Sequence, residues 1–156
     1  MRKAFDKNVQ TVWRTEGLKT FMVDLGRDAE ITGFSYTPAQ DDNLAGTIYK
    51  YRFEVSMDGS HWKTCATSGE FSNIMHNPVT CFVHFEQSYR GRFFRLVPLA
   101  EISGKPCTSI AEIGIFAVAL PAKDDESAVY PVPGAPLTLK LGCAPSVDGW
   151  SFFDCT

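Results

Sequence analysis

The chain has 156 residues, of which 44% are hydrophobic and 21% are charged, and its formal net charge is −3. This length suits one domain that buries a core of its own. A mildly acidic chain without a Lys/Arg cluster argues against nucleic acid as a partner, and no apolar run approaches the roughly 20 residues that cross a bilayer. No apolar segment follows the basic start Met1-Arg2-Lys3, so we expect neither a signal peptide in this sequence nor membrane insertion.

Alternation of apolar and polar residues with period two dominates from Phe21 to Val118 and predicts β-strands. The clearest example is Tyr49–Ser56, where aromatic and aliphatic residues occupy one face and charged residues the other. In chain order, strands are expected at Phe21–Leu25, Ile31–Tyr36, Tyr49–Ser56, Trp62–Ala66, Val79–Phe85, Arg92–Val97 and Ile110–Val118. Because no stretch shows the helical period of 3.6, the sequence predicts an all-β fold, an antiparallel β-sandwich or jelly roll.

The connections between these strands alternate in length. Short turns are expected at Gly26–Glu30, Met57–Ser60 and Glu86–Gly91, and longer loops at Arg14–Thr20, Thr37–Thr47, Ser68–Pro78 and Pro98–Ser109. If successive strands run antiparallel, all the long loops gather at one end of the sandwich. Loops of that length in a compact domain are more often functional than idle, although they could simply cap the open end.

The composition changes after Leu120. Four prolines between Pro121 and Pro136 and the acidic run Asp124-Asp125-Glu126 predict an extended linker over 121–149, with a short strand at Leu137–Leu141. Another short strand is expected at Trp150–Cys155. We therefore divide the chain into a β-sandwich over 1–120, a Pro-rich linker over 121–149 and a terminal strand over 150–156.

Several motifs, in order and at matching spacing, resemble those of the discoidin domain, also called coagulation factor V/VIII type C. They are Ala4-x-Asp6-x-Asn8-x-x-Thr11-x-Trp13, Val23-Asp24-Leu25-Gly26, Gly33-Phe34-x-Tyr36-x-Pro38, Gly46-x-Ile48-x-x-Tyr51, Ser56-x-Asp58-Gly59-x-x-Trp62, Arg92-x-Phe94-Arg95-Leu96 and Ala111-Glu112-Ile113. Two further stretches, Gly69–Ile74 and Asn77–Val79, look like modules appended to bacterial glycoside hydrolases such as α-L-fucosidases and β-hexosaminidases. The resemblance implies an eight-stranded sandwich of the galactose-binding-domain type that binds a glycan and has no catalysis of its own. It also implies a catalytic domain in the same polypeptide and a periplasmic or extracellular location.

One departure from this family concerns its opening strand. Members usually begin with a strand that reads like Trp-x-Val-x-Cys-x-Ser, which is absent before Ala4, whereas Trp150–Thr156 resembles it. The chain could be a circular permutant or a piece cut across a tandem array. In either case we expect Trp150–Cys155 to pair into a sheet of its own molecule or, by strand exchange, of a neighbouring copy.

A calcium site is predicted near the start of the chain. Asp6, Asn8 and Thr11 bear oxygens on an irregular segment, and the loop argument places Glu112 at the same end. Calcium takes six to eight such oxygens. The resemblance implies the same structural site, with backbone carbonyls of Ala4, Asn8 and Ala111 contributing. An Asx-turn at Asp6 and a solvent-facing Glu112 are the alternative.

A glycan site is predicted at the loops, where planar polar groups can bind sugar hydroxyls. The candidates are Arg14, Glu16, Gln40, Asp41, Asn43, Asn73 and His76. Galactose-binding relatives often show Trp-His-Thr at Trp13-Arg14-Thr15 and Pro-Arg at Pro38-Ala39, so galactose itself is not predicted, and Arg14 is expected to act as the donor.

Catalysis has little support, because no nucleophile motif accompanies the three histidines and no separated carboxylate pair is evident. The sequence therefore predicts a non-catalytic carbohydrate-binding module of a bacterial glycoside hydrolase, which raises the effective concentration of substrate. The alternative is a calcium-stabilised protein-interaction or spacer module without sugar binding. Phospholipid binding would need exposed apolar loop tips, and these loops are polar.

Overall fold

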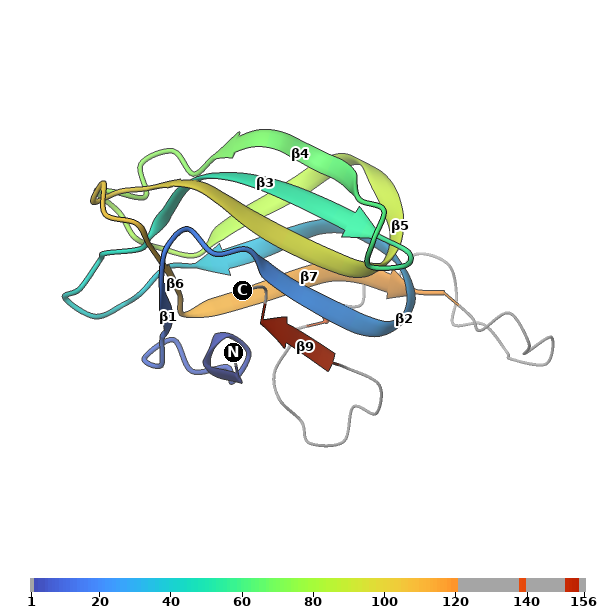
Figure 1. Ribbon diagram of the computed structural model, residues 1–156, viewed down its shortest axis with the longest axis horizontal. Coiled ribbons are helices and arrows are strands. Elements are labelled where there is room, and N and C mark those ends of the chain that lie inside the picture. The colour runs from blue at the N-terminus through green and yellow to red at the C-terminus, as the bar shows by residue number, and fades with distance from the viewer. Residues whose placement is uncertain (1, 121–137, 140–150, 155–156) are drawn as a thin grey trace.

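The computed structural model of the protein describes residues 2–120, 138–139 and 151–154 (Figure 1). A short 3-10 turn, η1 (Arg2–Ala4), precedes the strands. The strands are β1 (Trp13–Glu16), β2 (Phe21–Thr37), β3 (Ile48–Ser56), β4 (Lys63–Glu70), β5 (Cys81–Glu101), β6 (Cys107–Ile110), β7 (Glu112–Ala119), β8 (Thr138–Leu139) and β9 (Ser151–Asp154). The all-β prediction is confirmed.

The strands pair antiparallel in two sheets. The larger sheet has the order β4-β3-β5-β2-β7-β8, with β9 against β2, and the smaller one joins β1 to β6. The long strands β2 and β5 run along one layer, bend, and return along the other, so each belongs to both layers of the sandwich (Figure 1). None of the helices in the described residues has the length and hydrophobicity to span a membrane.

Two of the predicted turns are wrong. Residues 26–30 and 86–91 lie inside the continuous strands β2 and β5. The pairing of β2 with β5 shifts register between Asp24 and Ala29 and again between Ile31 and Gly33, so the chain changes layer through bulges rather than through hairpin turns. Gly26 has φ 72°, and its N–H donates to Asp24 Oδ1 at 2.7 Å, which stabilises the first bulge. The turn predicted at Met57–Ser60 is confirmed as the connection between β3 and β4.

The long loops do gather at one end, as predicted, but two are shorter than expected, because Arg14–Glu16 and Cys107–Ser109 pair with each other as strands β1 and β6. We call this the loop end; it comprises residues 17–20, 38–47, 71–80 and 102–106, at the left of Figure 1. The Gln40 amide donates to the Pro78 carbonyl at 2.8 Å, and the Gly17 N–H donates to the Pro106 carbonyl at 2.6 Å. The opposite end, which we call the corner end, comprises the bulges at 25–28 and 85–88 and the loop at 57–62.

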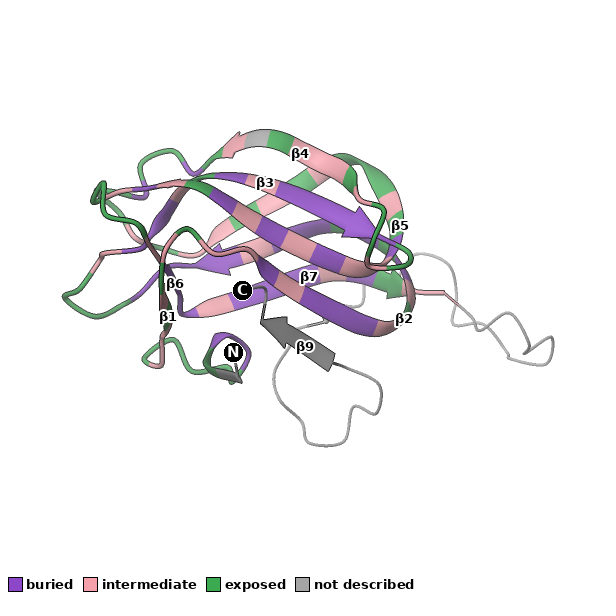
Figure 2. Cartoon of the chain, in the orientation of Figure 1, coloured by how far each residue is buried: buried purple, intermediate pink, exposed green. Residues whose placement is uncertain are grey.

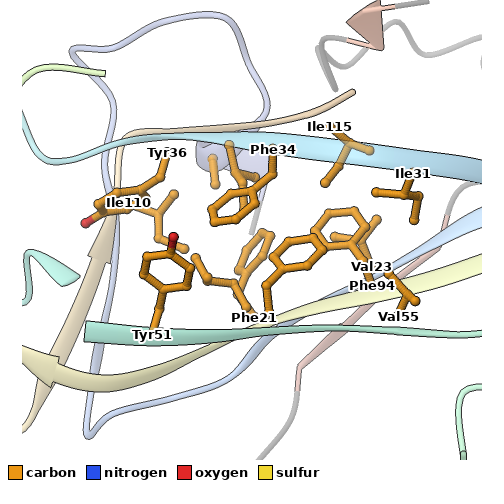
Figure 3. Packing of buried hydrophobic residues seen from close by; sticks show 14 of the residues in the cluster. Phe21, Val23, Ile31, Phe34, Tyr36, Tyr51, Val55, Phe94, Ile110 and Ile115 are labelled. Carbon is orange, nitrogen blue, oxygen red and sulfur yellow. The ribbon is translucent and has the colours of Figure 1, made fainter. Parts of the chain in front are cut away.

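Aromatic and aliphatic side chains fill the core (Figure 3), and the strands of both layers carry buried residues (Figure 2). Phe34 stacks on Phe53 with centroids 4.4 Å apart, and Phe53 stacks on Phe94 at 5.6 Å. Each such burial contributes about 1.5–3 kcal/mol. Phe71 is the first residue after β4, and its ring stacks on Tyr51 with centroids 4.3 Å apart, so the core also anchors the start of a long loop.

The terminal strands complete the larger sheet. Strand β9 pairs antiparallel with Phe21–Asp24, so the expected pairing of the C-terminal segment into a sheet of its own molecule is present. That this strand takes the place of the family's opening one stays a prediction. Trp150 and Cys155, the outer residues of that predicted strand, lie outside the described residues. The Pro-rich linker over 121–149 also lies outside them, except for β8, which pairs with β7. The choice between permutation and a cut tandem array stays a prediction.

Candidate functional site

A shallow depression of about 330 Å³ opens at the loop end. It is lined by Arg14, Thr15 and Glu16 of β1, by Asn43 and Ala45 of loop 38–47, and by Cys107 and Thr108 of β6. Three segments that are distant in sequence thus supply one surface. Arg14, Glu16 and Asn43 were predicted as ligand-binding residues, and the structure brings these three together.

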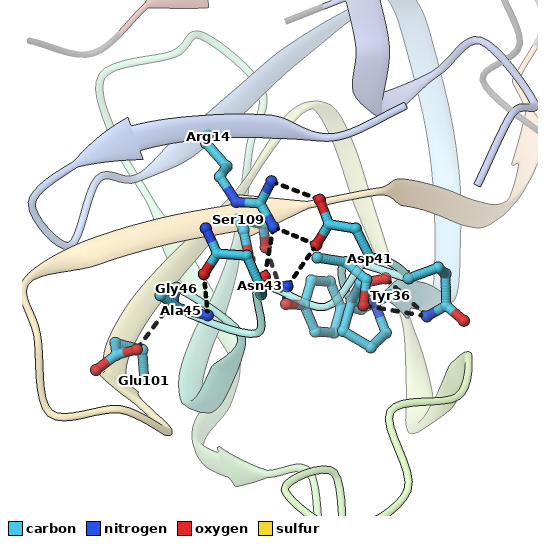
Figure 4. A network of polar contacts seen from close by, with 11 residues as sticks. Arg14, Tyr36, Asp41, Asn43, Ala45, Gly46, Glu101 and Ser109 are labelled. Atoms are coloured by element: carbon cyan, nitrogen blue, oxygen red, sulfur yellow. Dashed lines mark hydrogen bonds and ion pairs between the residues drawn. The ribbon is translucent and has the colours of Figure 1, made fainter. Parts of the chain in front are cut away.

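Arg14 is held in place by the neighbouring loop (Figure 4). Its Nη1 donates to Asp41 Oδ2 at 2.9 Å, and its Nη2 donates to Asp41 Oδ1 at 2.7 Å and to the Asn43 carbonyl at 2.5 Å. The hydrogen bond to Arg14 lowers the pKa of Asp41, and the same bond raises the pKa of Arg14. The predicted residue Asp41 therefore orients Arg14 and balances its charge.

Loop 38–47 is shaped by its own polar side chains. The Asn43 N–H donates to Asp41 Oδ1 at 3.2 Å, and Asn43 Oδ1 accepts from the Ala45 N–H at 3.2 Å. Gln40, another predicted residue, donates to the carbonyls of Pro38 and Pro78 and so links this loop to loop 71–80. Gln40 does not line the depression.

A buried carboxylate behind the depression was missed by the sequence analysis. Glu101 is 9% exposed, and its Oε2 accepts from the Gly46 N–H at 2.9 Å and from Ser103 Oγ at 2.7 Å. Its Oε1 accepts from the Lys105 N–H at 2.6 Å. Burial by itself would raise the pKa of Glu101, but these hydrogen bonds outweigh that effect and lower it. A lone acid at the end of the apolar run Leu96–Ala100 is the signal that could have identified it.

Tyr36 is the second buried residue that fixes the loop end. Its hydroxyl donates to the Ser109 carbonyl at 2.9 Å and accepts from the Ile48 N–H at 3.0 Å. Gly46 contacts the same segment, because its carbonyl accepts from the Ser109 N–H at 2.8 Å. Its φ is 86°, and a Cβ there would lie 2.8 Å from the Ser109 nitrogen. Only glycine fits this position, which explains why a glycine stands there.

The remaining predicted ligand-binding residues lie elsewhere. Asn73 and His76 are exposed in loop 71–80 and do not line the depression. Asn73 has φ 64°, and its carbonyl accepts from the His76 N–H at 3.0 Å. The neighbouring Phe71 and Ile74 are buried, so this loop is anchored in the core.

The predicted metal ligands at the chain start surround one hydroxyl group. Thr11 Oγ1 lies 2.5 Å from Asp6 Oδ2, 2.9 Å from the Asn8 carbonyl and 3.3 Å from the Lys3 carbonyl. Carboxylate, hydroxyl and carbonyl oxygens are the donors that calcium prefers, so this cluster suits that ion. Lys3 was not predicted. Asp6 Oδ1 also accepts from the Asn8 N–H at 2.9 Å, so the Asx-turn is present as well.

The other three predicted metal residues flank this cluster. Ala4 and Ala111 are fully buried, and the Ala111 N–H donates to the Thr37 carbonyl at 3.0 Å. Glu112 is half-buried rather than solvent-facing and begins β7, against which η1 packs. Within the described part of the chain, no three His, Cys, Asp or Glu side chains gather as a metal site. Any ion here would need carbonyl and hydroxyl oxygens in addition to the carboxylates of Asp6 and Glu112.

Comparison with known proteins identifies relatives of this architecture. The chain is 33% identical over 122 residues to galactose oxidase from Gibberella zeae, covering 73% of the chain but only 17% of that enzyme. It therefore spans a small part of this curated relative.

Two solved structures are similar to this chain over most of their own length. CpGH89CBM32-5 from Clostridium perfringens, determined with GalNAc-β-1,3-galactose, superposes with a TM-score of 0.63 at 28% identity, covering 73% of this chain and 81% of that one. The family 32 module of C. perfringens NanJ, determined with galactose, gives 0.61 at 22% identity, covering 72% and 81%.

The neighbour at 28% identity is, by its name, a family 32 carbohydrate-binding module, in agreement with the expectation that this chain is not an enzyme. The family model of the F5/8 type C domain matches residues 1–113. The chain belongs to the F5/8 type C, or discoidin, domain family.

Proposed function

We propose that this domain is a non-catalytic carbohydrate-binding module that binds glycan in the loop-end depression and holds a larger enzyme near its substrate. The observation that carries the proposal is the convergence of Arg14, Glu16 and Asn43 on one depression. A structural neighbour at 28% identity was solved with a disaccharide, which supports the same class of ligand here. Weak binding at one site is enough, because tethering raises the effective concentration of substrate.

The chemistry of the depression suits hydroxyl groups. Arg14 keeps N–H donors beyond those that bind Asp41 and Asn43, and the exposed Glu16 carboxylate accepts hydrogen bonds. Ala45, which is half-buried, adds apolar surface to the lining. A saccharide presents alternating hydroxyl and C–H surface, which matches this arrangement.

Glycan-array screening and affinity electrophoresis test the proposal. We expect binding to at least one glycan, and its loss in Arg14→Ala with the fold retained. Arg90→Ala is the matched control, because Arg90 forms an exposed ion pair with Asp28 at 2.9 Å at the corner end. Binding that survives Arg14→Ala, or that falls equally in Arg90→Ala, would contradict this location.

We also propose that calcium binds the oxygen cluster of Asp6, Asn8, Thr11 and the Lys3 carbonyl, with Ala4, Ala111 and Glu112 completing the site. The ion would tie the start of the chain to β7. An ion bound only by the folded state stabilises it by mass action, so chelation is expected to lower the melting temperature. In Asp6→Asn the same chelator should have no further effect. An equal melting temperature with and without chelator in the wild-type protein argues against the site.

The second candidate function is a calcium-stabilised spacer or protein-interaction module without sugar binding. Two observations favour it: Arg14 already binds Asp41 and Asn43, and none of the described residues lining the depression is aromatic. An absence of binding to fucosylated, galactosyl and hexosamine glycans in the screen would support it.

The proposed host is a bacterial glycoside hydrolase that acts in the periplasm or outside the cell. The solved neighbours from C. perfringens glycoside hydrolases support this host, whereas the match to a galactose oxidase domain points to an oxidase as the other candidate. Sequencing beyond this domain decides between the two.

A further inference from the structure

This inference rests on the proposed function and concerns the charge of the saccharide. Of the described residues that line the depression, Arg14 alone is a cation, and Glu16 is an anion. An acidic sugar would depend on Arg14 for its carboxylate, because the guanidinium fork matches a carboxylate in two parallel hydrogen bonds.

That fork is already occupied. Asp41 accepts from both terminal nitrogens of Arg14, and the Asn43 carbonyl accepts from one of them. The pair is 2.7 Å apart at its closest, with the Arg14 side chain 33% exposed and that of Asp41 45% exposed. The pKa of Asp41 is lowered by this hydrogen bond, so the carboxylate remains charged at neutral pH.

A carboxylate ligand would therefore meet two like charges. It would either displace Asp41 from Arg14 or share the guanidinium with that carboxylate at close range, and it would face Glu16 across the same depression. A neutral hydroxyl needs no such displacement, because it can use the remaining Arg14 donors and the Glu16 acceptor. We propose that Asp41 is a specificity-determining residue that restricts the depression to uncharged saccharides and excludes uronates.

Paired probes test this with the sugar ring held constant. Isothermal titration calorimetry at neutral pH compares galactose with galacturonate, glucose with glucuronate, and methyl-esterified with de-esterified polygalacturonan. The measured quantity is the ratio of dissociation constants within each pair. Asp41→Asn keeps the shape of the side chain but removes its charge. Asp42→Asn is the matched control, because Asp42 is the next residue and is exposed, whereas the described carboxylate that pairs with Arg14 is that of Asp41.

We expect the wild-type protein to favour the neutral member of a pair, and Asp41→Asn to shift that ratio toward the uronate by about fivefold, the upper range for an exposed charge pair. Asp42→Asn should leave the ratio unchanged. Equal wild-type affinity for both members, an unchanged ratio in Asp41→Asn, or an equal shift in Asp42→Asn would overturn the inference. So would a wild-type protein that binds none of the neutral probes. The glycan screen, which does not involve Asp41, separately decides whether the proposed function falls too.

Discussion

The two ends of the sandwich hold their backbone in different ways. At the corner end, β2 and β5 stay paired on both sides of each bulge, and the main local aids are Gly26 and the Asp24–Arg92 pair, with contacts of 2.7 and 2.8 Å. At the loop end the ladder stops, and separate loops are joined by side chains. There the Tyr36 hydroxyl donates to the Ser109 carbonyl and accepts from the Ile48 N–H. The Glu101 carboxylate accepts from the Gly46 N–H (Figure 4) and from the Lys105 N–H.

This difference predicts how stability relates to binding at each end. Where a ladder sets the path of the chain, a local change costs stability but leaves distant residues in place. Where a few buried polar side chains set the path, the same change also moves the residues that line the depression. Stability and binding should therefore be coupled at the loop end and separable at the corner end.

The largest effect is expected from Tyr36→Phe. Removing this hydroxyl leaves the Ile48 N–H and the Ser109 carbonyl without their buried partner. Two such groups cost about 3 kcal/mol of the free energy of unfolding. Urea denaturation measures the change. Tyr49→Phe is the control, because it deletes the same atom from an exposed contact with Glu70 Oε1 at 2.6 Å and should change stability little.

If Tyr36→Phe and Tyr49→Phe give equal free energies of unfolding, the loop end does not depend on its buried network. If Tyr36→Phe is destabilised but binds glycan with unchanged affinity, the coupling between stability and binding is wrong.

Sequence patterns predicted the fold well because they depend on local rules. Alternation located β3 to within a residue, and the parity of loop lengths located the loop end. The bulges were misread as turns because Gly26 and Gly91 look like turn signals, whereas pairing with a strand distant in sequence keeps both segments extended.

The site was predicted only in part, for a related reason. Arg14, Glu16 and Asn43 converge because the order of the strands brings their segments together, which loop parity could anticipate. The roles of Asp41 and Glu101 depend on individual distances between loops, and no periodicity encodes those. Asn73 and His76 were expected by their polarity, yet Phe71 and Ile74 anchor that loop so that neither reaches the depression.

A smaller effect is expected from Glu101→Gln, and it should depend on pH. The folded-state pKa of Glu101 lies below the ordinary value of 4.5. Its stabilisation is therefore present above that value and is lost as pH falls through the lower folded-state pKa. At neutral pH the substitution should lower the free energy of unfolding by about 2 kcal/mol. The two carboxylate oxygens of Glu101 each accept from a backbone N–H, whereas the amide of Gln has one oxygen, so one N–H would face the NH2 group.

The free energy of unfolding, measured by urea denaturation from neutral to acidic pH, checks this. The difference in the free energy of unfolding between the wild-type protein and Glu101→Gln should shrink on acidification. Glu70→Gln, an exposed carboxylate at the edge of the sheet, is the control. A wild-type advantage that stays constant with pH would show that the charge of Glu101 is not what holds loops 38–47 and 102–106.

The smallest effect is expected from alanine substitutions at two glycines with positive φ, one at each end of the sandwich. Gly26 and Gly17 have φ angles of 72° and 81°, and a Cβ at Gly17 would touch nothing nearer than 3.9 Å. Alanine at either position should cost about 1 kcal/mol, the penalty for a side chain in the left-handed region. Gly17 adjoins Glu16 and donates its N–H to the Pro106 carbonyl, so Gly17→Ala should also weaken glycan binding, whereas Gly26→Ala should not. Thermal melts and titration calorimetry on both variants separate the two effects. Equal losses of affinity would mean that the corner end transmits strain through the sheet to the depression. The two ends would then differ in how their backbone is held, but not in their effect on binding.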